Sequence, residues 1–180
     1  WKLEPLDIPD REANKWDKTH PLAQIAATWA KSRRTNRHYV NVVKAVKWWK
    51  VSQQADMDYP KGYPLEHLLW VSCPDGITSI AEGVVSALED IASHYQTYAS
   101  AGQVPFVPDH GVPDHNVLGR LSVEDFQEFH RRICIAAEQA RDAYDESNVC
   151  ESAEKWRLLF GPKFPQCPEN TKKGGYTPRK

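Results

Sequence analysis

Helical spacing of apolar residues organises the centre of the chain. Between residues 36 and 50, a rotation of about 100° per residue gathers five side chains on one arc: Tyr39, Val42, Val43, Val46 and Trp49. A second helix is expected from Pro64 to Trp70, because a proline at the first helical position lacks only an N–H that would be unpaired anyway. A short polar connection joins these two predicted helices.

Helix-start and helix-stop signals mark the remaining elements. Pro21 follows Thr19-His20 and opens a helix. Ser79 with Glu82, and Ser122 with Asp125, are capping boxes. Gly161-Pro162 is a typical helix stop. The expected ranges are about 21–32, 80–98, 123–144 and 151–160. The sequence therefore predicts an all-α domain of about six packed helices with little strand.

The chain divides into three segments by composition. Residues 1–18 carry prolines and charges without a helical period, and are expected to form an extended lead-in with room for one short strand. Residues 19–165 form the helical domain, with a proline- and glycine-bearing loop over 99–121. Residues 166–180 form a polar, basic tail that is expected to be disordered.

Charge and composition limit the function classes. The formal net charge is −1, so the chain has no global basic footprint for duplex nucleic acid. No apolar run approaches the ~20 residues of a membrane span, and no signal peptide opens the chain, so a cytoplasmic protein is expected. The four cysteines form no C-x-x-C pair and are expected to be free thiols in a reducing compartment.

A lysine and a tyrosine flank the connection between the two central helices. Lys47 lies roughly 40° from Val43 on the helix, at the border of the apolar arc, where its stem can pack and its charge can reach a cleft. Gly62 and Tyr63 precede Pro64 and can bring backbone and an aromatic face to the same cleft. A point charge beside a stacking ring suits a nucleotide. The plainer alternative is boundary packing by the aromatics and a solvated lysine.

Several sequence runs resemble one enzyme family. V-K-A-V-K-W-W (43–49) and K-G-Y-P-L-E-H-L-L (61–69) are followed by P-D-H-G-V-P-D-H-N-V (108–117), E-S-A-E-K-W-R-L-L-F-G (151–161) and K-F-P (163–165). Together, over roughly residues 9–165, they resemble the helical half of the oligoadenylate synthetase and cyclic GMP–AMP synthase superfamily. The likeness is greatest to the bacterial members (CD-NTases) that make cyclic oligonucleotides in anti-phage defence (CBASS).

The resemblance implies roles for particular residues. The family's triphosphate-contacting lysine matches Lys47, and its base-stacking tyrosine matches Tyr63, with Gly62 beside it. Lys44 and Lys61 are secondary candidates for nucleotide contact. Glu66 is expected to hold either Lys47 or a backbone group.

The chemistry of nucleotidyl transfer is missing from the chain. The reaction needs two metal ions held by closely placed carboxylates. Asp56-Met57-Asp58 has D-x-D form but lies in a loop, and no Gly-Ser pair occurs. His110 and His115 in the 99–121 loop are interpreted as hydrogen-bonded staples rather than metal ligands. No catalytic or metal-binding residue is therefore assigned to this chain, which is expected to be inactive alone.

The leading hypothesis is the C-terminal helical domain of a bacterial cyclic-oligonucleotide synthase. Its substrates would be ATP or other nucleoside triphosphates, with Mg²⁺ held by an N-terminal catalytic half. A start at Trp1, with Met57 the only methionine, indicates a trimmed or partial product. An activating protein is a further candidate partner. The alternatives are a non-catalytic helical interaction module and a linear oligoadenylate or RNA 3′-end nucleotidyltransferase.

Overall fold

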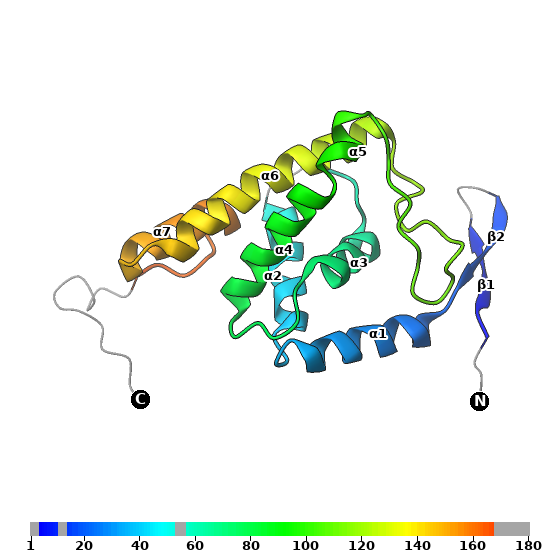
Figure 1. Cartoon of the computed structure of the whole chain (residues 1–180), viewed down its shortest axis with the longest axis horizontal. Coiled ribbons are helices and arrows are strands. Elements are labelled where there is room, and N and C mark those ends of the chain that lie inside the picture. Colours follow the sequence, from blue (N-terminus) through cyan, green and yellow to red (C-terminus); the bar gives the residue numbers. More distant parts are fainter. Residues whose placement is uncertain (1–3, 11–13, 53–56, 168–180) are drawn as a thin grey trace.

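A two-stranded hairpin leads into a bundle of helices (Figure 1). The computed structural model describes residues 4–10, 14–52 and 57–167. Within these ranges the strands are β1 (Leu6–Asp10) and β2 (Lys15–Thr19). The helices are α1 (Pro21–Arg34), α2 (Tyr39–Ser52), α3 (Gly62–Ser72), α4 (Ile80–His94), α5 (Gln96–Ser100), α6 (Val123–Asp145) and α7 (Val149–Phe160). The mostly helical fold expected from the sequence is confirmed.

The core lies between α2, α3, α4 and α6. All five residues of the predicted α2 arc are buried, from Tyr39 to Trp49. Alanines at Ala136, Ala137 and Ala140 line the buried stripe of α6, and their small side chains let this long helix pack closely against α4. Gly83 serves the same purpose on α4, because an added Cβ would lie 2.5 Å from a methyl carbon of Val42.

The predicted helix over 80–98 is divided in two. It begins as expected, with the Ser79 hydroxyl accepting from the Glu82 N–H. It ends at His94, however, and α5 starts only after Tyr95, whose φ is −99° and ψ 3°. Tyr95 is buried, with its ring edge-on to Phe126 of α6 at 6.3 Å. This tertiary contact overrides the local helical pattern, so the prediction of a single helix over residues 80–98 was wrong.

The lead-in contains two strands rather than one. β1 and β2 pair antiparallel, with Leu6 opposite Thr19 and Asp10 opposite Lys15. Because β1 contains Pro9 and both strands are rich in charge, neither shows an alternating pattern strong enough to predict. The pair can be recognised only through its mutual hydrogen bonds. Thr19 then passes directly to His20, whose imidazole caps the first turn of α1.

Two basic side chains in the last turn of α1 are tied to neighbouring elements. Arg34 Nε lies 2.9 Å from Asp75 Oδ2, and the Lys31 ammonium lies 3.1 Å from the other oxygen of the same carboxylate. Arg34 also lies over the ring of Trp70 at 5.8 Å. These contacts fix the C-terminal end of α1 against the turn before α4 and against α3.

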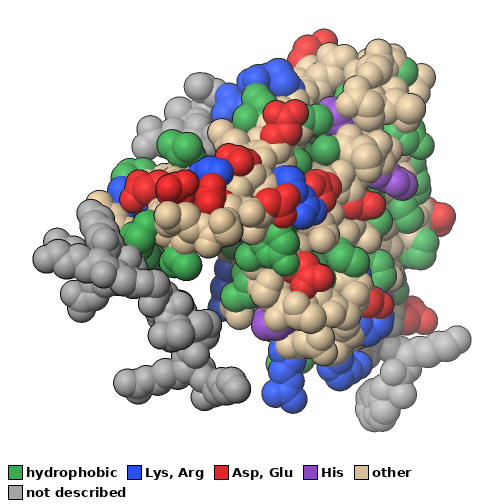
Figure 2. Space-filling view, turned by 60° about the vertical axis from the view of Figure 1, so that its left-hand side comes forward, with side chains coloured by type: hydrophobic (Ala, Val, Ile, Leu, Met, Phe, Trp, Pro, Cys, Tyr) green, Lys and Arg blue, Asp and Glu red, His purple; other side chains and the backbone are tan. Residues whose placement is uncertain are grey.

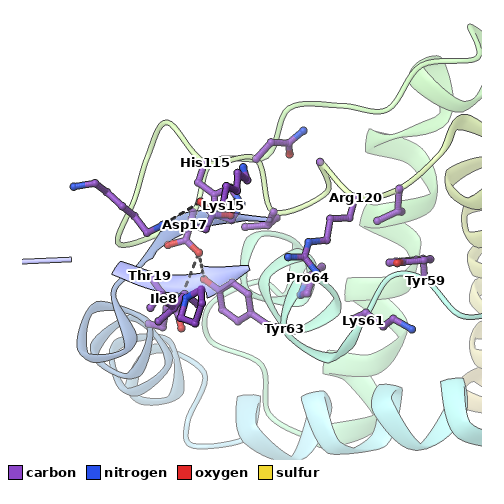
Figure 3. Close-up of a pocket in the computed structure, with 18 residues that line it drawn as sticks. Ile8, Lys15, Asp17, Thr19, Tyr59, Lys61, Tyr63, Pro64, His115 and Arg120 are labelled. Carbon is purple, nitrogen blue, oxygen red and sulfur yellow. Dashed lines mark hydrogen bonds and ion pairs between the residues drawn. The ribbon is translucent and has the colours of Figure 1, made fainter. Parts of the chain in front are cut away.

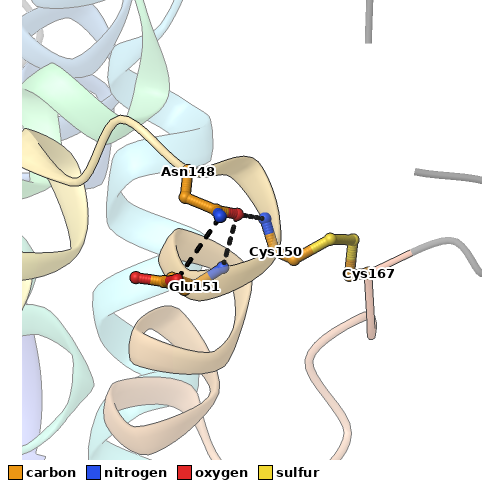
Figure 4. Close-up of a disulfide and its surroundings, with 4 residues drawn as sticks. All are labelled: Asn148, Cys150, Glu151 and Cys167. Atoms are coloured by element: carbon orange, nitrogen blue, oxygen red, sulfur yellow. Dashed lines mark hydrogen bonds between the residues drawn. A yellow bond between two sulfur atoms is a disulfide. The ribbon is translucent and has the colours of Figure 1, made fainter. Parts of the chain in front are cut away.

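Two of the four cysteines form a disulfide, which corrects the expectation of four free thiols. Cys150, in the first turn of α7, is bonded to Cys167 (Figure 4). Gly161 ends α7 with φ 85°, and the chain after it returns alongside the helix to bring the two Cα atoms within 4.9 Å. The sequence could not show this return. Cys73 and Cys134 are free. Of the predicted tail, residues 168–180 lie outside the described residues.

Charges are interspersed over the surface of α6 and α7. Figure 2 shows acidic side chains on this face of the molecule with basic ones among them, and ion pairs join Arg132 to Glu128, Arg141 to Glu89 and Lys155 to Glu146. This mixed pattern differs from the continuous basic stripe of a duplex-binding surface. Among the described helices, none has the length and apolar character needed to cross a membrane.

Candidate nucleotide-contact site

Lys47 is held at the junction of α2 and α3 by an ion pair. Its Nζ lies 2.8 Å from Glu66 Oε2, and its side chain remains 39% exposed. The other Glu66 oxygen accepts from Thr28 Oγ1 at 3.4 Å. Tyr39, buried beneath, donates its hydroxyl to the Glu66 backbone oxygen at 2.9 Å. The expectation that Glu66 holds Lys47 is confirmed.

Tyr63 lies in the first turn of α3 and is fixed by its hydroxyl. The phenol donates to Asp109 Oδ2 at 2.5 Å. Burial, together with the Asp109 carboxylate, raises the pKa of Tyr63 well above its ordinary value, so the phenol stays protonated as a donor. Burial would raise the pKa of Asp109 too, but hydrogen bonds from Tyr63 and from backbone N–H groups outweigh it and hold this pKa below its ordinary value.

A pocket of about 760 Å³ lies between the hairpin, the start of α3 and the end of the 99–121 loop (Figure 3). Figure 3 shows Tyr63 between the hairpin and Pro64, with Lys61 and Arg120 toward one end. The charged groups of its lining are four cations, two carboxylates and an imidazole beside one of them: Lys15, Lys18, Lys61, Arg120, Asp17, Asp109 and His115. A volume of this size matches small-molecule sites, and the lining favours an anionic ligand with an aromatic part.

The predicted site residues are only partly brought together. Tyr63 and Lys61 line the pocket. Lys61 lies 3.4 Å from Asp58, with its ammonium 4.8 Å from the centre of the Tyr59 ring. Lys47 does not line the pocket. Its ion pair with Glu66 links it to α3, one helical turn after Tyr63.

The other two predicted residues lie outside the lining. Gly62 is the exposed first residue of α3, with open space where a Cβ would be. Lys44 is exposed on α2. The nucleotide roles of all five residues remain predictions.

Several pocket residues were missed by sequence reasoning. Arg120, Lys15 and Lys18 reach the pocket from the loop end and the hairpin, elements whose approach to α3 depends on the tertiary fold. Gln24 of α1 and Asp109 of the loop meet Tyr63 there. The turn composition of Pro108-Asp109-His110-Gly111 was the one available signal, since aspartate in such turns usually accepts backbone N–H groups.

The loop histidines are packed or paired within the fold. The His110 ring lies 4.0 Å from that of His67 and 4.2 Å from that of Trp70. Burial, and then the neighbouring His110, lower the pKa of His67 to about 4, and burial also lowers the pKa of His110, so both imidazoles are neutral near pH 7. His115 Nε2 lies 3.8 Å from Asp17. These contacts fit packed and paired loop residues, and the expectation that the two histidines hold no metal stays a prediction. Among the described residues, no group of three potential metal ligands occurs.

Three sequence relatives carry related names. The chain is 48% identical over 166 residues to the "Cyclic AMP-AMP-GMP synthase" of Enterobacter hormaechei subsp. hoffmannii, covering 92% of this chain and 44% of that protein. A "Probable cyclic AMP-AMP-GMP nucleotide synthase" of Salmonella paratyphi B is 48% identical over the same length. A "Cyclic AMP-AMP-AMP synthase" of Acinetobacter sp. is 30% identical over 159 residues, 88% of this chain and 46% of that protein. The chain thus spans less than half the length of these relatives.

The fold has a solved counterpart. Escherichia coli MS115-1 CdnC, in a structure described with ATP, superposes with a TM-score of 0.69 and 16% identity over 89% of this chain and 56% of that one. The same protein in a complex with HORMA gives a TM-score of 0.65 over 84% and 53%. No protein-family profile matches the chain. By sequence and fold, the chain is a relative of the bacterial CD-NTases, the cyclic-oligonucleotide synthases, and corresponds to their helical part.

Proposed function

We propose that this chain forms the wall of a nucleotide cleft in a cyclic-oligonucleotide synthase and contacts the triphosphate and base of a bound nucleotide. The observation that carries the proposal is Tyr63, which is held by Asp109 at the edge of a basic pocket and lies one helical turn from the Lys47–Glu66 pair. Close sequence relatives named as cyclic trinucleotide synthases supply the reaction class.

Each of these side chains has a separate task. The Lys47 ammonium neutralises phosphate oxygens as a point charge. Tyr63 stacks on the base, an interaction worth about 1–3 kcal/mol in single-stranded nucleic-acid sites. Lys61 and Lys44 give weaker electrostatic support. We propose ATP and GTP as substrates, in line with the names of the 48% identical relatives.

We propose that the metal ions and the catalytic carboxylates belong outside this chain. The described residues offer no cluster of potential metal ligands, so they do not fit Mg²⁺, and no step through the ion is assigned to them. We propose that the remaining part of the protein holds Mg²⁺ and faces this cleft. An activating protein of the kind seen in the CdnC–HORMA complex is a proposed partner. The proposed compartment is the cytoplasm, where nucleoside triphosphates are abundant.

Product analysis tests the proposed function. Full-length protein incubated with ATP, GTP and Mg²⁺ is expected to yield a cyclic oligonucleotide, resolved by chromatography and mass spectrometry. The Tyr63→Ala variant is expected to lose about 5- to 150-fold in catalytic efficiency, since a stacking contact of about 1–3 kcal/mol is removed.

The control for this test is Tyr98→Ala, which truncates a tyrosine that is 39% exposed and lies outside the pocket lining. It should retain wild-type efficiency. Linear products would favour an oligoadenylate or RNA 3′-end enzyme. Unchanged turnover in Tyr63→Ala would reject the site.

A further inference from the structure

Asp109 is a buried carboxylate at the point where three elements meet. Only 4% of the residue is exposed, and it lies in the 99–121 loop between α3 and α1. It accepts four hydrogen bonds, two at each oxygen. Burying a charged carboxylate is costly unless its lone pairs are satisfied, and here they are.

The two oxygens of Asp109 serve different parts of the molecule. Oδ1 accepts from the N–H groups of Gly111 at 2.7 Å and Val112 at 3.2 Å, which closes the loop's own turn. Oδ2 accepts from the Tyr63 hydroxyl at 2.5 Å and from Gln24 Nε2 at 3.3 Å. A loop staple needs only the first pair. The second pair reaches α3 and α1, so it requires a separate explanation.

We propose that Asp109 is a positioning residue that fixes the ring of Tyr63 in the orientation used to stack on the nucleotide base. The proposal rests on the proposed function of Tyr63. A tyrosine at a half-buried pocket edge would otherwise rotate about its side-chain bonds, and binding would have to order it. Charge-assisted hydrogen bonds of this kind are short and strong, so the ring is ordered before the ligand arrives.

The contact also joins the pocket wall to distant parts of the chain. Tyr63 and Asp109 are 46 positions apart, and Gln24 and Asp109 are 85 apart. The loop, α1 and α3 therefore meet at one carboxylate oxygen. A movement of the loop would therefore move the hydrogen-bond acceptor of Tyr63. We expect contact with the base to depend on the turn that Asp109 closes with Gly111 and Val112.

A double-mutant cycle in the full-length protein tests this inference. The variants are Tyr63→Phe, which keeps the ring and removes the hydroxyl, Asp109→Asn, and the two combined. Each single variant is expected to raise the KM for ATP about 5-fold, the effect of one net hydrogen bond, with kcat within about 2-fold of wild type. Because both changes act on the same charge-assisted hydrogen bond, one by removing its donor and the other by removing the charge of its acceptor, the double variant should also show about a 5-fold rise rather than the roughly 25-fold of independent sites.

Asp114→Asn is the matched control. It removes the same charge from an exposed position in the same loop, and KM should be unchanged. If the rises in KM of the two single variants multiplied in the double variant, the inference would be overturned, and Asp109 would serve only to close the turn of its own loop. If Asp109→Asn unfolds the protein, Tyr63→Phe alone decides, since an unchanged KM overturns the inference. A normal KM in Tyr63→Ala would instead reject the proposed function itself.

Discussion

Replacing Lys47 with methionine in the full-length protein is expected to weaken ATP binding by about 10- to 100-fold, since a charged hydrogen bond contributes about 1.5–3 kcal/mol. Methionine keeps the length and apolar stem of the side chain while removing its ammonium. Lys47 Nζ already lies 2.8 Å from Glu66, so the site positions this cation without a ligand present. Calorimetric titration of ATP provides the measurement.

Two neighbouring changes make the Lys47 result specific. Lys47→Arg keeps the positive charge and should retain most of the affinity. Lys44→Met removes the same group one turn earlier on α2, where the lysine is exposed, and should change affinity by about 3-fold at most. Equal losses at both lysines would indicate a diffuse electrostatic effect. An unchanged affinity in Lys47→Met would remove Lys47 from the site.

The Trp49→Ala substitution is expected to cost about 3–5 kcal/mol of folding free energy, the usual range for truncating a buried large aromatic side chain. Trp49 is 2% exposed and belongs to the buried arc of α2. Its loss leaves a cavity in the core on the buried face of α2. The urea unfolding transition of the full-length protein, followed by circular dichroism, measures the effect.

The adjacent tryptophan is the control for this substitution. Trp48 is 42% exposed, and its indole N–H donates to the Phe160 backbone oxygen at 2.9 Å. The Trp48→Ala substitution should therefore cost about 1 kcal/mol, mainly from that hydrogen bond. If the two variants unfolded at the same urea concentration, the assignment of the buried face of α2 would be wrong.

Local signals predicted most of the helices because helix formation depends on neighbouring residues. Ser122 and Asp125 form the expected capping box at the start of α6. The failures occurred where distant contacts decide. The helix that begins at Ile80 ends before Tyr95, whose buried ring contacts Phe126. Cys150 forms a disulfide with Cys167 because the chain reverses direction after α7. The β1–β2 hairpin is likewise defined by pairing rather than by pattern.

In the candidate site, too, the sequence indicated residues with local signals and missed those whose position depends on distant contacts. The sequence indicated Lys47 and Tyr63, together with a role for Glu66 that the structure confirms. It did not indicate that Asp109 holds the Tyr63 hydroxyl, because the two residues lie 46 positions apart. Arg120 was missed for the same reason: it reaches the pocket from the end of a long loop whose path the sequence leaves open.

Photolabelling of the full-length protein with 8-azido-ATP tests the central claim most directly, because it reports which side chains lie against the base. After irradiation and peptide mapping, we predict a label in the segment that contains Tyr63, suppressed by excess ATP and strongly reduced in Tyr63→Ala. A label suppressed by ATP but confined to residues outside this chain, and unaffected by Tyr63→Ala, would contradict the claim that this helical domain contacts the nucleotide base.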